Sequence, residues 1–304
     1  MAMSLLLAQR VLVMFALAGV GFAMFRAGKI TLEGNRTIGN ILIYLSLPAV
    51  IIKSLMVGRT VENAVALAEG AGVALVLIVV AALVARLTCR RDGIGNFAGT
   101  FSNPSFFGIP LIAATIGEAC VFYNAGFIFL MNIGQWTYGV SLLTGERERI
   151  SWRDVLLAPF TIAMLVGLVL FSAQPPLPVV VTDCLGFVAD LNTPLAMFSL
   201  GVYLAQVNPR AMFRRVANYR VSLARLVVAP LVSLAILTLL PLPSYEMRMA
   251  LLIAASCPVG SNVAVYAQLH DSDYAYAVET VVISVLLSIV TIPVVVGLAN
   301  ALWL

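Results

Sequence analysis

The 304-residue chain is 62% hydrophobic and only 11% charged, with a formal net charge of +4 and a mean hydropathy of +1.03. Soluble domains contain roughly 45–50% apolar and about 25% charged residues, so this composition excludes a soluble globular protein. The single histidine, His270, leaves little room for a histidine-rich metal site. We find no HExxH, GxSxG or Walker lysine motif and no carboxylate pair placed for acid–base chemistry. We therefore expect a membrane protein that is not an enzyme.

Ten apolar segments follow one another along the chain. A bilayer core of about 30 Å requires roughly 20 apolar residues in a helix. The segments lie at residues 4–25, 37–57, 63–86, 95–116, 119–143, 153–172, 179–206, 216–240, 246–268 and 273–302. This pattern predicts an all-α polytopic protein with ten transmembrane helices. A cleaved signal peptide is the alternative for the first segment, but its length and Arg10 argue against that.

Basic residues alternate between the loops that join these segments. Loops one, three, five and seven contain thirteen of them: Arg26, Lys29, Arg36, Arg86, Arg90, Arg91, Arg147, Arg149, Arg153, Arg210, Arg214, Arg215 and Arg220. The even-numbered loops contain only Arg59 and Arg248. Because lysine and arginine collect in cytoplasmic loops, we expect the odd loops in the cytoplasm and both termini on the extracytoplasmic side.

Two of the ten segments are interrupted at corresponding places. The first interruption is residues 101–110 (FSNPSFFGIP), and the second is residues 255–262 (ASCPVGSN), with Pro258 following Pro104 by 154 residues. Proline lacks an N–H and clashes with the preceding turn, so each helix must bend or break there. Freed backbone groups at membrane depth survive only where they face protein or a wet cavity. Matched breaks in two halves indicate the binding site of a transporter.

The two breaks also define an internal repeat. Aligning Pro104 with Pro258 divides the segments into five and five, and brings Pro48 of segment two opposite Pro194 of segment seven. Because five is odd, the second half enters the membrane from the opposite side. We predict two inverted five-helix repeats, 1–144 and 153–304, joined by a short cytoplasmic linker at 145–152. Helices 4 and 9 would be broken where they cross, a topology that supports alternating access.

The candidates for substrate contact are the prolines and amide or hydroxyl side chains of the breaks: Asn103, Pro104, Pro258, Ser261 and Asn262. An amide beside a break can donate to a carboxylate, and half-helix N-termini add partial positive charge. No pair of arginines lies at membrane depth, so these groups would hold an anion. The alternative is a structural kink in which Asn103 or Ser102 satisfies the freed carbonyl without any ligand.

Segment five adds a polar face. Asn124 and Gln135 are eleven residues apart, three helical turns, and so share one side of a helix. Such a face either bonds to a neighbouring helix or lines the substrate path. We include Asn124 among the substrate-binding candidates.

Three of the ionisable residues within the apolar segments are candidates for ion coupling. Charged groups at membrane depth are costly and mark functional sites by default. Lys53 late in segment two and Glu69 early in segment three could pair near the outer side, where they would replace a sodium ion or carry a coupling proton. Asp190 in segment seven is the other candidate for coupling. The alternative is that these side chains extend to the membrane interface.

Three stretches carry a resemblance to a known family: residues 101–111 (FSNPSFFGIPL), residues 191–204 (LNTPLAMFSLGVYL) and the end from Ser256 to Pro293. They resemble the auxin efflux carrier family, and the likeness runs through the whole chain in order. The resemblance implies ten helices in two inverted repeats, elevator-type movement of a transport domain against a scaffold domain, and a homodimer formed by scaffold domains. It also implies that the crossover prolines and adjacent polar positions line the substrate site. The central loop is short, which suggests a bacterial or archaeal member in the plasma (bacterial inner) membrane.

We therefore expect a secondary active or facilitative transporter of small organic anions, either carboxylates or auxin-like aromatic acids. The alternative is a sodium- or proton-coupled cation antiporter or symporter on the same fold, although segments four and nine lack the adjacent carboxylates that it would need. A lipid bilayer, an organic anion and a second copy of the chain are the expected partners. We expect no metal site, no nucleic-acid partner and no cofactor beyond a coupling sodium ion or proton.

Overall fold

A computed structural model describes residues 2–145 and 152–304, and this part of the chain is almost entirely helical, without any β-strand. The helices of the first half are α1 (Ala2–Arg26), α2 (Leu32–Ile41), η1 (Leu42–Ser46), α3 (Leu47–Leu55), α4 (Val61–Cys89), α5 (Gly93–Thr100), η2 (Pro104–Gly108), α6 (Ile109–Thr115), η3 (Glu118–Asn124), α7 (Ala125–Gly134), η4 (Gln135–Gly139) and α8 (Val140–Thr144). Those of the second half are α9 (Trp152–Leu157), α10 (Pro159–Ala173), α11 (Val179–Asp190), α12 (Asn192–Gln206), α13 (Pro209–Arg214), α14 (Val216–Leu223), η5 (Ala224–Val228), α15 (Ala229–Leu239), α16 (Tyr245–Ser256), α17 (Asn262–Leu269) and α18 (Tyr274–Trp303).

Six helical segments among the described residues are long and apolar enough to cross a membrane. They are Leu6–Arg26, Leu32–Leu55, Val61–Cys89, Val179–Gln206, Val216–Leu239 and Tyr274–Trp303. The prediction of an all-helical, multi-span membrane protein is thus confirmed. The segments expected at 95–116 and 246–268 are each divided, the first between α5 and η2 and the second between α16 and α17. The full count of ten crossings stays a prediction.

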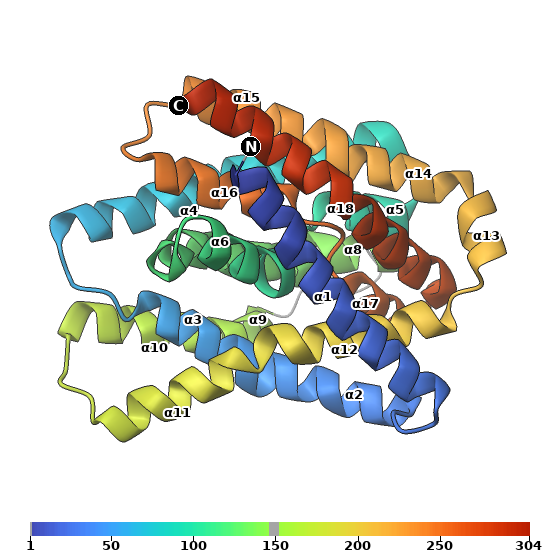
Figure 1. Cartoon of the computed structure of the whole chain (residues 1–304), viewed down its shortest axis with the longest axis horizontal. Helices are drawn as coiled ribbons and strands as arrows, with labels where there is room; N and C mark the ends of the chain where they lie inside the picture. Colours follow the sequence, from blue (N-terminus) through green and yellow to red (C-terminus); the bar gives the residue numbers. More distant parts are fainter. Residues whose placement is uncertain (1, 146–151) are drawn as a thin grey trace.

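The helices form two groups, which the ribbon view separates (Figure 1). In the first group α3 packs between α10 and α11, and α12 packs against α1 and α2. The second group contains α4 to α8 with η2 to η4, and α14 to α18 with η5. Helix α1 also contacts α6 and α18 and so touches both groups, as its diagonal course shows (Figure 1). Each group draws helices from both halves of the chain.

Close packing within the first group depends on glycine. A Cβ at Gly201 of α12 would lie 2.1 Å from the carbonyl oxygen of Ala18, and one at Gly21 of α1 would lie 2.3 Å from that of Phe198. Small residues of this kind let two helix backbones approach in a membrane. The α1–α12 contact therefore occurs at backbone distance, with no room for a side chain.

The outer surface suits a lipid environment. Along α4, Leu75, Val79, Leu83 and Leu87 recur every four residues and are all exposed. Residues at this spacing lie on one helix face, and a contiguous apolar stripe of this kind marks a membrane-facing surface. The interior side of α4, including Ala74, Leu77 and Ala81, is buried in the core.

Candidate functional site

The two helix breaks meet in the interior of the protein. Ser102 and Val259 form an isolated antiparallel bridge. The Asn103 N–H donates to the Pro258 carbonyl at 2.9 Å, and the Gly260 N–H donates to the Phe101 carbonyl at 3.0 Å. Because extended backbone cannot satisfy its own polar groups, each break supplies the partner that the other needs at membrane depth. We call this pairing, residues 101–104 with 257–262, the crossing.

Proline leaves one carbonyl without its helical donor in the second break. Pro258 has no N–H for the carbonyl of Ala254, four residues earlier. The Ser102 hydroxyl donates to that carbonyl at 2.9 Å. A side chain from one break thus satisfies a carbonyl that the other break exposes.

Arg225 performs the same task for the first break. Its Nη1 donates to the carbonyl of Thr100 at 3.0 Å, the carbonyl that Pro104 cannot serve. Nη2 donates to the Ala255 carbonyl, and Nη1 also lies 3.5 Å from the Gly99 carbonyl. The side chain is 1% exposed and lies in η5, within the apolar segment Val216–Leu239. Arg225 was not predicted from the sequence, because only paired arginines and arginines in loops were considered. The available signal was a single charge inside an apolar segment.

Asn103 has two contacts at the crossing. Its Oδ1 accepts from the Phe106 N–H at 3.1 Å and caps η2, while its Nδ2 donates to the Ser261 Oγ at 3.5 Å. The predicted candidates Asn103 and Ser261 are therefore brought together. The capping bond gives Asn103 a structural role, but it satisfies an N–H and not a freed carbonyl; the carbonyl bond of the structural alternative is made by Ser102. Only the Asn103 Nδ2 is directed across the crossing.

Three further amides join the crossing from neighbouring elements. Asn124 Nδ2 donates to the Pro104 carbonyl at 2.9 Å, and Asn262 Nδ2 donates to Gln135 Oε1 at 2.7 Å. The polar face of segment five thus contacts both breaks. Asn192 at the start of α12 donates to the Ser105 carbonyl at 3.2 Å, which links the first group to η2, directly after the crossing. Gln135 and Asn192 were not among the predicted site residues, because their partners lie far away in the sequence.

A small cavity lies beside the crossing, between the two groups. Its volume is about 30 Å³, and its lining includes Leu42, Phe106, Ser199, Tyr203, Ser261 and Asn262. A space of this size holds a water molecule but not a carboxylic acid. A substrate that reaches Ser261 and Asn262 by this route therefore requires the two groups to separate.

The ionisable candidates are arranged differently from the expectation. Lys53 Nζ lies 2.9 Å from Glu118 Oε1 and 3.7 Å from Asp190 Oδ1. Glu69 has no ion pair among the residues that the structure describes, so the expected Lys53–Glu69 pair is wrong. The reason is that α3 packs against α10 and α11, which brings Asp190 to Lys53.

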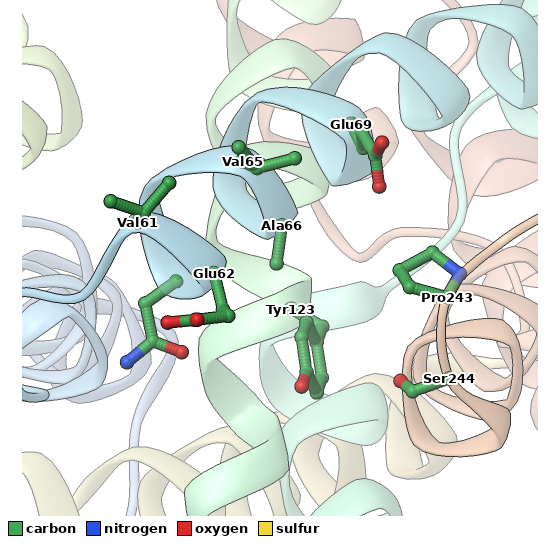
Figure 2. Close-up of a pocket in the computed structure, with 9 residues that line it drawn as sticks. Val61, Glu62, Val65, Ala66, Glu69, Tyr123, Pro243 and Ser244 are labelled. Atoms are coloured by element: carbon green, nitrogen blue, oxygen red, sulfur yellow. The ribbon is translucent and has the colours of Figure 1, made fainter.

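Glu69 lies instead in the wall of a separate cavity of about 410 Å³ (Figure 2). Glu62 and Glu69 of α4 line one side, and Tyr123, Pro243 and Ser244 lie on other elements around it. The two carboxylates repel an anion, and a largely apolar wall does little to stabilise its charge. We therefore place the candidate anion site at the crossing. No group of three or more potential metal ligands occurs within residues 2–145 and 152–304.

Comparison with known proteins points to transport. A family described as "Membrane transport protein" matches residues 144–296, half of the chain. A protein of Rhizobium meliloti (strain 1021) named "Putative malonate transporter" is 25% identical over 301 residues, covering 93% of this chain and 92% of the relative. A protein of Methanothermobacter thermautotrophicus (strain ATCC 29096 / DSM 1053 / JCM 10044 / NBRC 100330 / Delta H) named "Uncharacterized transporter" is 27% identical over 307 residues, covering 94% and 96%.

Proposed function

Because this chain belongs to the membrane transport protein family, to which the auxin efflux carriers also belong, we propose that it carries small organic anions across the plasma membrane as a secondary active or facilitative transporter. The observation that supports this is the crossing, where η2 and α17 begin at paired breaks. Helix N-termini carry partial positive charge, and the amides of Asn103 and Asn262 can add donors. Asn124, Pro104, Pro258 and Ser261 complete the proposed substrate site.

The proposed substrate class is a small carboxylate, with a short dicarboxylate as the first choice. One relative is named for malonate. The crossing has no pair of lysine or arginine side chains, which would be needed to bind a larger anion through charge alone. Aromatic acids of the auxin type are the second choice. A site built from helix ends and amides predicts modest affinity.

The proposed mechanism is an elevator in which the second group moves against the first. The crossing lies in the second group, while α1, α3 and α12 belong to the first. The small cavity between the groups, near Ser199 and Tyr203 on one side and Ser261 on the other, marks the surface along which they would part. In this proposal the chain crosses the membrane ten times as two inverted repeats, with both termini outside, and the first group forms a homodimer.

Lys53 and Asp190 are the proposed coupling or support residues, together with Glu118. A sodium- or proton-coupled cation carrier is the competing function, since this charged cluster lies within helical segments. It is less well supported, because the crossing contains no carboxylate and the charged side chain that lies against it is the arginine Arg225.

The test is ligand binding and transport by purified protein. Thermal-shift measurements with malonate, other dicarboxylates and indole-3-acetate, with and without sodium at two pH values, identify the ligand, since binding to the folded state raises Tm. Uptake of that ligand into proteoliposomes then measures transport. Asn103→Ala should weaken binding by about tenfold or more, the loss expected for one donor to a charged group.

Asn132→Ala is the matched control for this measurement. Asn132, in segment five, is a buried amide like Asn103, but its Nδ2 donates to the Ile128 carbonyl within its own helix. Its substitution should leave binding unchanged. Unaltered binding and transport in folded Asn103→Ala protein would remove the proposed site, and transport of cations alone would remove the proposed function.

A further inference from the structure

Arg225 is the single lysine or arginine that is buried among the residues whose side chains the structure describes. Its neighbours explain how a charge is tolerated there. No carboxylate of the described residues lies within ion-pair distance of its guanidinium. Its hydrogen-bond partners are backbone carbonyls of the two helices that end at the crossing, α5 and α16.

The carbonyls of Thr100 and Ala255 both lack the backbone N–H that would bond to them in a continuous helix. The residue four positions after Thr100 is Pro104, which has no N–H. The residue four positions after Ala255 is Val259, whose N–H donates to the Ser284 hydroxyl at 3.0 Å. Arg225 therefore replaces one backbone donor in each half of the chain. One side chain thus caps the C-terminal ends of both α5 and α16.

The charge balance follows from this arrangement. A helix C-terminus carries a partial charge of roughly −0.5, and an N-terminus roughly +0.5. The guanidinium of +1 offsets the two C-termini of α5 and α16. The N-termini of α17 and of the continuous helix Pro104–Thr115, formed by η2 and α6, face the crossing, and no carboxylate of the described residues lies there. The sum at the crossing is positive, although the residues of the crossing itself are all uncharged.

We propose that Arg225 determines the charge selectivity of the crossing. It is a positioning residue, because it acts through the ends of α5 and α16 and not by contact with the substrate. This inference rests on the proposed function, since it explains why a site made of amides and hydroxyls accepts an anion. Without the arginine, the four helix ends would cancel, and the crossing would discriminate little between a carboxylate and a neutral amide.

The experiment compares a dianion with a neutral molecule of the same shape. Binding of malonate and of malonamide is measured for the wild type, Arg225→Lys and Arg225→Gln. We expect Arg225→Gln to lose malonate affinity by at least about tenfold more than malonamide affinity, since charge at short range in a dry site acts strongly on a dianion. Arg225→Lys should retain the preference for malonate, because it retains the charge.

Arg248→Gln is the matched control. Arg248 Nη2 also donates to two backbone carbonyls, those of Leu240 and Leu242, but away from the crossing. Its loss should leave the malonate-to-malonamide ratio unchanged. A purely structural role for Arg225 predicts equal losses for both ligands, and that result overturns the inference while the carrier function stands.

Arg225→Lys keeps the test decisive where Arg225→Gln does not fold. A folded lysine variant that has lost the preference, at a pH low enough to keep the lysine protonated, shows that charge is not the determinant, and so also overturns the inference. If the wild type binds no carboxylate, the proposed function is wrong. If the wild type binds malonate but Arg225→Gln keeps its preference, only the inference about Arg225 is wrong.

Discussion

Ser102 illustrates at the scale of one residue how a side chain replaces a donor that proline removes. Its hydroxyl reaches the Ala254 carbonyl at 2.9 Å across a separation of 152 residues. Ser102→Ala leaves that buried acceptor unpaired, which should lower the free energy of unfolding by about 1–2 kcal/mol. The measurement is reversible unfolding in detergent or bicelles. In the control Ser288→Ala, the lost bond goes to the Val285 carbonyl within α18, which keeps its helical donor. Equal stability of the two variants would contradict the assigned role.

The effect of proline on its own helix explains which site residues could be predicted from the sequence. Proline acts on its own helix, so Pro104 and Pro258 located the breaks, and the polar residues beside them do lie together. The partners of those residues come from packing between distant helices. Spacing along the chain therefore missed Arg225, and it paired Lys53 with Glu69 although Glu118 is its neighbour. Whether the crossing residues bind substrate stays a prediction.

At the scale of elements, the α1–α12 pair depends on contact between backbones. Gly201→Ala would place a methyl group 2.1 Å from the Ala18 carbonyl oxygen, so the two helices must move apart. We expect a loss of about 1–3 kcal/mol in stability, the usual range for overpacking, and a lower Tm. Gly19→Ala, in the same helix pair, meets nothing within 4 Å. It should be neutral or slightly stabilising, because alanine favours a helix. A Tm for Gly201→Ala equal to that of Gly19→Ala would show that the contact is not required.

The π-helical turns are the part of the elements that the sequence did not show. Apart from the two predicted breaks, the apolar segments indicated regular helices, but η1, η2, η4 and η5 each contain a wide turn. These turns adjoin the crossing: η2 opens at Pro104, η4 carries Gln135, η5 carries Arg225 and η1 lines the small cavity. π-turns often occur at functional sites. Hydropathy averages over many residues and cannot detect one inserted residue, so the segments were found and their irregularities were not.

At the scale of the whole molecule, each group combines helices from both halves of the chain. The first group takes α1 to α3 from the first half and α10 to α12 from the second. Neither half can therefore form a group alone, which explains why the linker at 145–152, most of which lies outside the described residues, joins parts of one structure. The inverted relation between the halves stays a prediction.

The elevator proposal makes a prediction about the contact between the two groups. Gln206 of α12 and Tyr274 of α18 belong to different groups, and the Tyr274 hydroxyl donates to the Gln206 Oε1 at 3.3 Å. In a variant without the native cysteines, Gln206→Cys with Tyr274→Cys, joined by a short bis-methanethiosulfonate reagent that forms disulfides, should stop transport in proteoliposomes, and reduction should restore it. Because the crossing lies elsewhere, ligand binding should persist in the linked protein.

The matched control links two positions of the first group. Arg59 Nη1 donates to the Ser172 carbonyl at 2.8 Å, and this contact joins the loop that follows α3 to α10. Arg59→Cys with Ser172→Cys, treated with the same reagent, should therefore leave transport intact. Continued transport by the linked Gln206→Cys, Tyr274→Cys protein would show that the groups do not slide at this contact. The 30 Å³ cavity would then have to admit substrate by movements of side chains alone, and movement of whole groups would lose its main support.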